Sequence, residues 1–278
     1  MELNAIEHLV YGFVSGLTEI LPVSGRAHSA LLLKILGADE ISTLPVLMMR
    51  ISVLAAIYLS CQSHLVKMSR ARRLARIPKK RRKRPLDICS LMDSRFLITM
   101  MLPAIAVVLF YGRISQVNFS LLAVAAFLFL NGIILYIPQF LPGSNKDARS
   151  LSRVEGLIMG LGSGVSVLPG MSGIGTSVSV GSICGVERSY ALNMSLMTNM
   201  VYLAGMIVYD VLGLIQTGFG LLTFQWVVIY ILAAVAAFVS ATLAIRIMRA
   251  LATNTGFHLF SYYCWGIALF AFILNLMA

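Results

Sequence analysis

The segment Leu21-Pro22-Val23-Ser24-Gly25-Arg26-Ala27-His28 interrupts an otherwise apolar stretch that covers residues 5–36. A second interruption, Leu168-Pro169-Gly170-Met171-Ser172-Gly173-Ile174-Gly175, lies in the apolar stretch 154–184. Proline and glycine leave backbone polar groups without helical partners, and a chain at membrane depth tolerates this only inside protein or beside a polar cavity. Both stretches therefore predict re-entrant helix–loop–helix elements rather than plain spanning helices.

The two interruptions resemble each other, which indicates an internal repeat. Leu-Pro-Val-Ser-Gly at 21–25 matches Leu-Pro-Gly-Met-Ser-Gly at 168–173 with one insertion. Each follows a Gly-x-x-x-Gly pair, which favours close helix packing: Gly12/Gly16 in the first copy and Gly156/Gly160 in the second. Three plain apolar runs follow each interruption, so we predict two copies, residues 1–140 and 141–278.

Six uninterrupted apolar runs occupy most of the remaining chain. They fall at residues 44–64, 97–112, 119–140, 190–213, 226–248 and 257–277. Each run is about long enough to cross a hydrocarbon core of roughly 30 Å. Only 12% of the residues are charged and 59% are hydrophobic, which excludes a soluble fold, and continuous runs exclude a β-barrel. The predicted fold class is an all-α polytopic membrane protein with six transmembrane helices and two re-entrant elements.

The net charge of +11 is concentrated in one stretch. Eleven of the 22 Lys and Arg residues lie within residues 67–84, and no acidic residue does. A basic loop directly after an apolar run is typical of a cytoplasmic loop that faces anionic lipid, and we favour this interpretation over a nucleic-acid site. Three spans per copy bring the second copy into the membrane from the opposite side. The result is an inverted-topology repeat with both termini outside.

Ionisable side chains gather at the first interruption. Glu19 lies inside an apolar run, where a charge is costly and is by default a functional candidate; the alternative is a structural ion pair with Arg26 or Arg50. His28 is either a site residue or a buried histidine with satisfied hydrogen bonds. Arg26 either faces an anion or extends its side chain to the membrane interface. Arg50 is also unusual in its apolar run, and an ion pair with a nearby carboxylate would explain it.

The second interruption carries hydroxyl groups and glycines instead of charges. Half-helix N-termini at matching positions of inverted halves present free N–H groups, which suit an anion. The phosphate-binding candidates are Arg26, Gly170, Ser172, Gly173 and Ser177. The alternative for the small residues is that they only permit close helix packing.

The segment Gly16-Leu17-Thr18-Glu19-Ile20-Leu21-Pro22-Val23-Ser24, with His28 four residues on, resembles the first signature of the undecaprenyl-pyrophosphate phosphatase (bacitracin-resistance) family. Leu168-Pro169-Gly170-Met171-Ser172, with Ser177 five on, resembles the second. The likeness spans essentially the whole chain. It implies an integral enzyme of the bacterial cytoplasmic membrane that removes the terminal phosphate from a C55 isoprenoid diphosphate to recycle the cell-wall lipid carrier. It also implies a divalent cation, Mg or Ca, and a site open to the outer face.

The resemblance implies catalytic roles for Glu19, His28 and Ser24, and it leaves the attacking group open between Ser24, His28 and a water. Two departures from the family pattern bear on the site. Ser15 replaces an acidic or amide residue one turn before Glu19, so that Ser15 and Glu19 are the candidate metal ligands. Gly173 replaces an arginine, and we hypothesise that Arg26 supplies the missing guanidinium.

A second function stays open, because inverted repeats with midplane breaks are also typical of transporters. The alternative is a non-hydrolytic transporter or flippase of a lipid phosphate or other amphipathic anion. The expected partners are a polyprenyl diphosphate lipid and anionic membrane lipids at residues 67–84, with no nucleic acid; a homodimer is left open.

Overall fold

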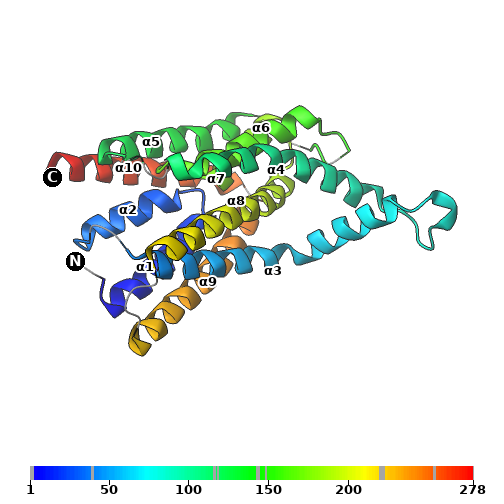
Figure 1. The fold of residues 1–278 in the computed structure, drawn as a ribbon. Helices are drawn as coiled ribbons and strands as arrows, with labels where there is room; N and C mark the ends of the chain where they lie inside the picture. The colour runs from blue at the N-terminus through cyan, green and yellow to red at the C-terminus, as the bar shows by residue number, and fades with distance from the viewer. Residues whose placement is uncertain are drawn as a thin grey trace.

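The computed structural model describes residues 3–38, 41–114, 117, 119–141, 145–147, 149–218, 223–252 and 255–277, and these contain helices and no β-strand (Figure 1). The first half comprises α1 (Ala5–Ile20), α2 (Gly25–Ile35), α3 (Thr43–Ala75), α4 (Ile88–Ile114) and α5 (Leu121–Tyr136). The second half comprises α6 (Arg153–Gly164), α7 (Gly173–Ile183), α8 (Arg188–Thr217), α9 (Phe224–Ala252) and α10 (Leu259–Met277). Short 3-10 turns lie at Lys79–Arg81, Ile137–Phe140, Val165–Val167 and Thr255–His258.

Six of the described helices are long and apolar enough to cross a membrane, which confirms the predicted number of spans. They are α3, α4, α5 with its 3-10 extension to Phe140, α8, α9 and α10. Both ends of the chain lie at one end of the bundle, and the basic segment between α3 and α4 lies at the other (Figure 1). Which end faces the cytoplasm stays a prediction from the charge distribution.

The basic segment begins with helix rather than loop. The sequence predicts a loop over residues 67–84, but α3 continues to Ala75 and only the remainder leaves the helix. Lysine and arginine are good helix formers, so the helix continues through the first basic residues of this segment. It ends at Ala75, shortly before Pro78, which cannot continue a helix. On the far side, α4 begins at Ile88 rather than at 97.

Two helix pairs are too short to span the membrane as single helices. α1 has 16 residues and α2 has 11, and the chain leaves the helix at 21–24 between them. At 1.5 Å per residue these helices measure about 24 and 17 Å, less than a hydrocarbon core of roughly 30 Å. α6 and α7 repeat the arrangement around a longer interruption, residues 165–172. Their re-entrant path through the membrane stays a prediction.

Each half's opening helix packs on a spanning helix of the other half: α1 on α9, and α6 on α4. The predicted glycine pairs lie at these contacts. A Cβ atom added at Gly12 would lie 2.3 Å from the carbonyl oxygen of Ala233, and one added at Gly160 would lie 2.2 Å from that of Met100. The glycines therefore allow backbone-to-backbone approach, as the sequence predicts.

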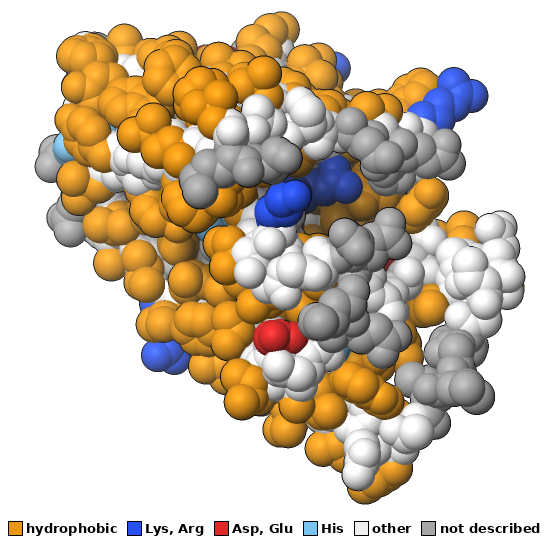
Figure 2. Space-filling model, turned by 90° about the vertical axis from the view of Figure 1, so that its left-hand side faces the viewer, with side chains coloured by type: hydrophobic (Ala, Val, Ile, Leu, Met, Phe, Trp, Pro, Cys, Tyr) orange, Lys and Arg blue, Asp and Glu red, His pale blue; other side chains and the backbone are white. Residues whose placement is uncertain are grey.

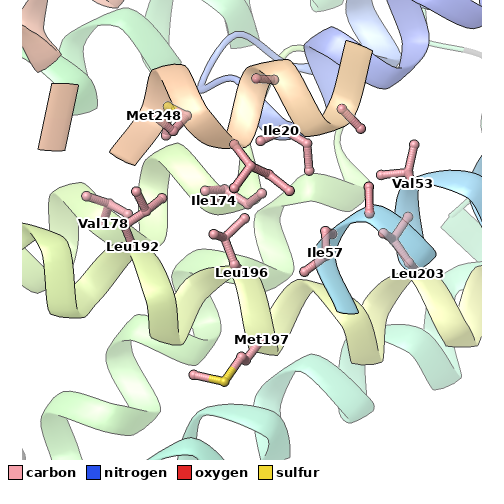
Figure 3. Close-up of a cluster of buried hydrophobic side chains, with 14 of the residues drawn as sticks. Ile20, Val53, Ile57, Ile174, Val178, Leu192, Leu196, Met197, Leu203 and Met248 are labelled. Carbon is pink, nitrogen blue, oxygen red and sulfur yellow. The ribbon is translucent and has the colours of Figure 1, made fainter. Parts of the chain in front are cut away.

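Five helices meet in the buried core. Figure 3 shows Ile20 of α1, Ile174 of α7 and Leu196 of α8 near the middle of this core, with Ile57 of α3 to one side and Met248 of α9 to the other. The outside is also apolar, because large hydrophobic side chains are exposed along all six spans. Figure 2 looks onto the end that carries the termini: hydrophobic side chains cover its left and upper parts, and Lys or Arg side chains lie in a hollow near the middle. The apolar outer surface of the six spans suits contact with lipid rather than with water.

Candidate functional site

A cavity of about 170 Å³ lies between α1, α2, α3 and α8, beside the first interruption. Its polar lining comes mainly from the first half of the chain: Tyr11, Ser15, Glu19, Arg26, Ser29 and Arg50. Apolar side chains such as Met49, Val53, Leu203 and Met206 complete the wall. A space of this size holds several water molecules or a small anion.

A narrower cavity of about 20 Å³ lies next to the larger one, on the side of the second interruption. The two share Glu19, Gly25, Arg26 and Met206 as lining residues. The narrow cavity also reaches Ser172 and Gly173 at the start of α7, and Asn199 and Tyr202 of α8. The two interruptions, 147 residues apart in the chain, therefore both contribute to the lining of the narrow cavity.

Glu19 lies in the last turn of α1, one turn after Ser15, so both side chains reach the same cavity. Its carboxylate lies against the start of α2: a Cβ atom added at Gly25 would be 2.8 Å from Glu19 Oε2. The carboxylate thus lies near the positive end of a helix dipole. Among the described residues no cation lies within ion-pair distance of Glu19, and Arg26 and Arg50 act on it electrostatically from farther away.

Arg26 extends from α2 toward the second interruption. One guanidinium nitrogen donates to the carbonyl of Val167, and another donates to Tyr111 Oη at 3.1 Å. The guanidinium also lies over the Tyr111 ring, 5.2 Å from its centre. These contacts hold the guanidinium inside the protein, where Arg26 lines both cavities and shares the narrow one with Gly173.

Position 173 itself has no room for the family's arginine. A Cβ atom added at Gly173 would lie 2.4 Å from the carbonyl oxygen of Ser163, so the backbone would have to shift. Arg26 and Gly173 line the same narrow cavity. This supports the hypothesis that the guanidinium of Arg26 replaces the arginine side chain that the family pattern has at position 173. The substitution of roles stays a prediction.

Arg50 forms an ion pair with Asp210 of α8, as the structural alternative predicts. The pair crosses from α3 to α8 and lies partly buried, with Arg50 still lining the larger cavity. A buried charge is stable only when it is paired and hydrogen-bonded. Asp210 therefore fixes a second guanidinium close to Glu19.

Ser24 lies outside the lining of both cavities. It has φ 69°, in the left-handed region, and its Oγ accepts hydrogen bonds from Gly170 N at 2.9 Å and from Ala27 N at 3.4 Å. The serine thus caps α2 and joins the two interruptions. Backbone strain of this kind persists only where surrounding contacts hold it, and here they do.

His28 points away from Glu19, toward α10. Its ring nitrogens contact Ser24 O at 2.9 Å and Tyr263 Oη at 2.8 Å, and the ring stacks on that of Tyr263. The residue is 9% exposed and lines neither cavity. The structure therefore gives His28 the satisfied surroundings of the structural alternative, while its catalytic role stays a prediction.

The polar residues of the second interruption divide between cavity and interior. Ser172 caps α7 by accepting from Gly175 N at 3.2 Å, and it lines the narrow cavity with Gly173. Gly170 gives its N–H to Ser24, and Ser177 accepts from Ser195 Oγ at 2.8 Å within the bundle. Glu19, Ser15, Arg26, Ser172 and Gly173 are thus brought together, and Ser24, His28, Gly170 and Ser177 lie behind them.

Three functional candidates were not predicted. Asn131 of α5 is fully buried and bonds both interruptions: its Nδ2 donates to Pro22 O, and its Oδ1 accepts from Ser172 N, each at 3.0 Å. Asn199 and Tyr202 of α8 line the narrow cavity with their polar atoms buried, Asn199 interacting with Glu19 and Tyr202 with Ser166. An isolated asparagine in an apolar span is the signal that points to Asn131 and Asn199.

The oxygen donors at the site fit a divalent cation only together with a phosphate. Glu19 and Ser15 share the cavity, but within the described part of the chain no three His, Cys, Asp or Glu side chains form a cluster. Mg²⁺ is commonly held by one or two carboxylates plus substrate phosphates rather than by an all-protein cage. The donor set is compatible with that arrangement.

Comparison with known proteins agrees with these motifs. The family model described as bacitracin resistance protein BacA matches residues 8–270. Relatives named undecaprenyl-diphosphatase include proteins of Methanobrevibacter smithii (27% identity, covering 98% of each chain), Desulforapulum autotrophicum (26%, covering 97% of this chain and 98% of the relative) and Thermosipho africanus (27%, covering 97% and 100%). At such low identity the chain is a divergent relative of these proteins. With its family match across nearly the whole length, the chain belongs to the bacitracin resistance protein BacA family.

Proposed function

We propose that this membrane protein hydrolyses undecaprenyl diphosphate to the monophosphate. The proposal is supported by the names of the relatives and, above all, by one observation: Glu19 and Arg26 line the narrow cavity together with Ser172 and Gly173 at the start of α7. A carboxylate, a guanidinium and a helix N-terminus are the groups that hydrolysis of a diphosphate requires.

The charges of the cavity suit a diphosphate. Phosphoryl transfer spreads negative charge over three oxygens, which positive groups must stabilise. Arg26 lies where it can donate to a phosphate oxygen, and Arg50 adds a second positive charge that Asp210 holds in place. The backbone N–H of Gly173, in the first turn of α7, offers a further donor in the narrow cavity.

A water in the cavity is the attacking group that the geometry favours. Ser24 is 1% exposed and its Oγ already accepts two hydrogen bonds, and His28 faces α10. In the proposed step the water oxygen forms a bond to the terminal phosphorus, the bridging P–O bond breaks, and Glu19 receives the water proton. The products are inorganic phosphate and the lipid monophosphate. Ser24 and His28 then position the loop rather than attack.

A divalent cation, Mg or Ca, is part of the proposal. Glu19 and Ser15 would hold it together with the phosphate oxygens, and it would supply further neutralisation of charge on the leaving phosphate. Stimulation of turnover by added Mg²⁺ or Ca²⁺ and its loss in EDTA would support this part. Unchanged turnover in EDTA would contradict it, and the two arginines would then carry the charge stabilisation without a cation.

The proposed membrane arrangement has both half-helix pairs re-entrant, the basic segment inside and in contact with anionic lipids, and the cavity open to the outer side. A scan of single cysteines by impermeant labelling tests it. Position 80 should be labelled only after the membrane is permeabilised, and labelling from outside would overturn the arrangement. Cross-linking in proteoliposomes tests separately for a homodimer.

The activity is tested with the purified chain in proteoliposomes and a C55 diphosphate. The wild type should release inorganic phosphate, and Glu19→Gln should lower kcat/KM by at least about 100-fold, because it removes the proton acceptor and a metal ligand without changing shape. Glu187→Gln is the matched control, since Glu187 is exposed at the start of α8 and its side chain makes no capping bond there. Ser24→Ala should retain most of the turnover.

Two results would overturn the phosphatase proposal. One is a Glu19→Gln protein as active as the wild type. The other is a wild-type protein that binds the lipid diphosphate and moves it across the bilayer without releasing phosphate, which would establish the non-hydrolytic transporter instead. Both are measured on the same proteoliposomes.

A further inference from the structure

A further cavity lies away from the proposed active site, at the basic end of the bundle. It has a volume of about 350 Å³ and is lined only by residues of α3 and α4. Neither interruption contributes to it, and none of its lining residues is acidic. It is therefore a separate space with its own chemistry.

The polarity of this α3–α4 groove changes along its length. On α3 the lining residues follow one helical stripe that begins with Leu65 and Met68 and continues with Arg72, Arg73 and Arg76. α4 contributes Leu97, Ile98 and Met101 from its facing side. One end of the groove is thus apolar, and the other carries three guanidinium groups.

The length of α3 places this gradient across the edge of a membrane. Its 33 residues extend about 50 Å, roughly 20 Å more than a hydrocarbon core. The arginines lie in its last turns, next to the basic segment that the sequence places at the membrane surface. The apolar end then lies at acyl-chain depth and the arginines at headgroup depth.

We propose that the α3–α4 groove binds one anionic phospholipid, with its phosphate among Arg72, Arg73 and Arg76 and an acyl chain along the apolar end. Guanidinium groups pair with phosphate oxygens through a planar fork. Nearby Asp93 of α4 does not compete, because it lines no part of the groove and accepts a hydrogen bond from Tyr190 Oη at 3.1 Å. The proposal differs from a diffuse attraction between the basic segment and the membrane, because it assigns a single saturable site.

The test measures binding of dioleoylphosphatidylglycerol to the detergent-solubilised full chain by native mass spectrometry. The combined variant Arg72→Ala, Arg73→Ala, Arg76→Ala should bind this lipid at least about tenfold more weakly than the wild type. The matched control is Lys79→Ala, Lys80→Ala, Arg81→Ala, which removes the same charge from exposed positions outside the groove and should leave binding within about twofold.

Further arms identify the source of the phosphate and guard against misfolding. Dioleoylphosphatidylcholine, with the same chains and no net charge, should bind more weakly, and soluble glycerol phosphate should not compete. Met101→Trp keeps every charge but fills the apolar end, and it should also weaken binding. Equal loss in the two triple variants, competition by glycerol phosphate, or full binding by Met101→Trp would each overturn the proposal.

Discussion

The two helix–break–helix elements, α1–α2 and α6–α7, share a plan but differ in what they contribute. Each opens with a capping box, Asn4 with Glu7 and Ser152 with Glu155. Each resumes its helix at a serine cap followed by a glycine. Only the first carries ionisable side chains at its break, namely Glu19, Arg26 and His28; the second carries hydroxyls and glycines.

The second element supplies shape and backbone donors instead of charge. A Cβ atom added at Gly175 would lie 2.5 Å from Pro22 Cβ, so the glycine allows the first break to pack directly on α7. Gly170 N–H donates to Ser24 of the first break, and Val167 accepts from Arg26. The comparison indicates that a duplicated element can divide its chemistry, with one copy carrying the reactive groups and the other holding them.

Among variants that test the contacts between the two elements, the largest effect is expected at Arg26, whose side chain extends from α2 of the first element to Val167 of the second. Arg26→Lys should lower kcat/KM roughly 30- to 150-fold, which corresponds to a loss of about 2–3 kcal/mol of transition-state stabilisation. The reason is that an ammonium group cannot reproduce the planar pair of N–H donors with which a guanidinium binds phosphate. Phosphate release from the C55 diphosphate measures it. Arg113→Lys, at an exposed position near the end of α4, should be silent. Wild-type turnover in Arg26→Ala would show that the guanidinium only anchors the loop.

The bond between the copies is tested at Asn131. Asn131→Leu keeps the size of the side chain but leaves Pro22 O and Ser172 N without their buried partner, which should cost about 2 kcal/mol of unfolding free energy. Thermal unfolding in detergent measures the loss. Turnover should fall as well, because both breaks shift; an unchanged midpoint with unchanged turnover would mean that the two breaks are held by other contacts.

The shape-bearing role of the second copy is tested with a pair of glycines. Gly173→Ala places a Cβ against the carbonyl of Ser163 and should destabilise the protein by about 1–2 kcal/mol. Gly213→Ala is the control, because nothing lies within 4 Å of its added Cβ in α8, and alanine there favours the helix. Chemical denaturation compares the two. Equal midpoints would contradict the close contact at 173.

The smallest effect concerns the start of α6. Partial burial raises the pKa of Glu155, but hydrogen bonds from Lys146 and Ser152 outweigh it and leave the pKa lowered. Because the pKa of Glu155 is lower in the folded protein than in the unfolded chain, where it is near 4.5, the ionised carboxylate stabilises the fold at pH values above 4.5. This stability is lost as the pH falls through the pKa of the folded state. We expect a loss below about 1 kcal/mol on acidification. Glu155→Gln should remove that part of the pH dependence of the unfolding midpoint; an identical pH profile would contradict the assignment.

The spans could be predicted from sequence because long apolar runs leave no other stable arrangement. The breaks were predicted to within a few residues, since proline and glycine act locally. The ends of α3 and α4 were not, because basic residues form helix as readily as loop once they leave the lipid. Orientation and the re-entrant path depend on the membrane, which the helices alone do not define.

The site was predicted only in part, for a geometric reason. Adjacent motif residues on α2 face different ways: Gly25, Arg26 and Ser29 line the cavity, while Ser24 and His28 contact the second break and α10. A sequence motif shows how far apart residues lie along the chain, but it does not show which face of the helix each side chain occupies once the helix is packed. Asn131 bonds to Pro22, 109 residues before it, and to Ser172, 41 residues after it, and no local pattern indicates such partners.

The packing of α1 on α9 sets an order for assembly during synthesis. Gly12 meets Ala233, a partner 221 residues later in the chain (233 − 12). At roughly 5–20 residues per second, a ribosome needs about 10–45 s to make that partner. Throughout that interval the segment that carries Glu19 has no α9 to pack on, and its carboxylate must be accommodated by water, by the translocation machinery or by the membrane edge. The helix that carries the proposed catalytic carboxylate is therefore made well before the helix on which it packs.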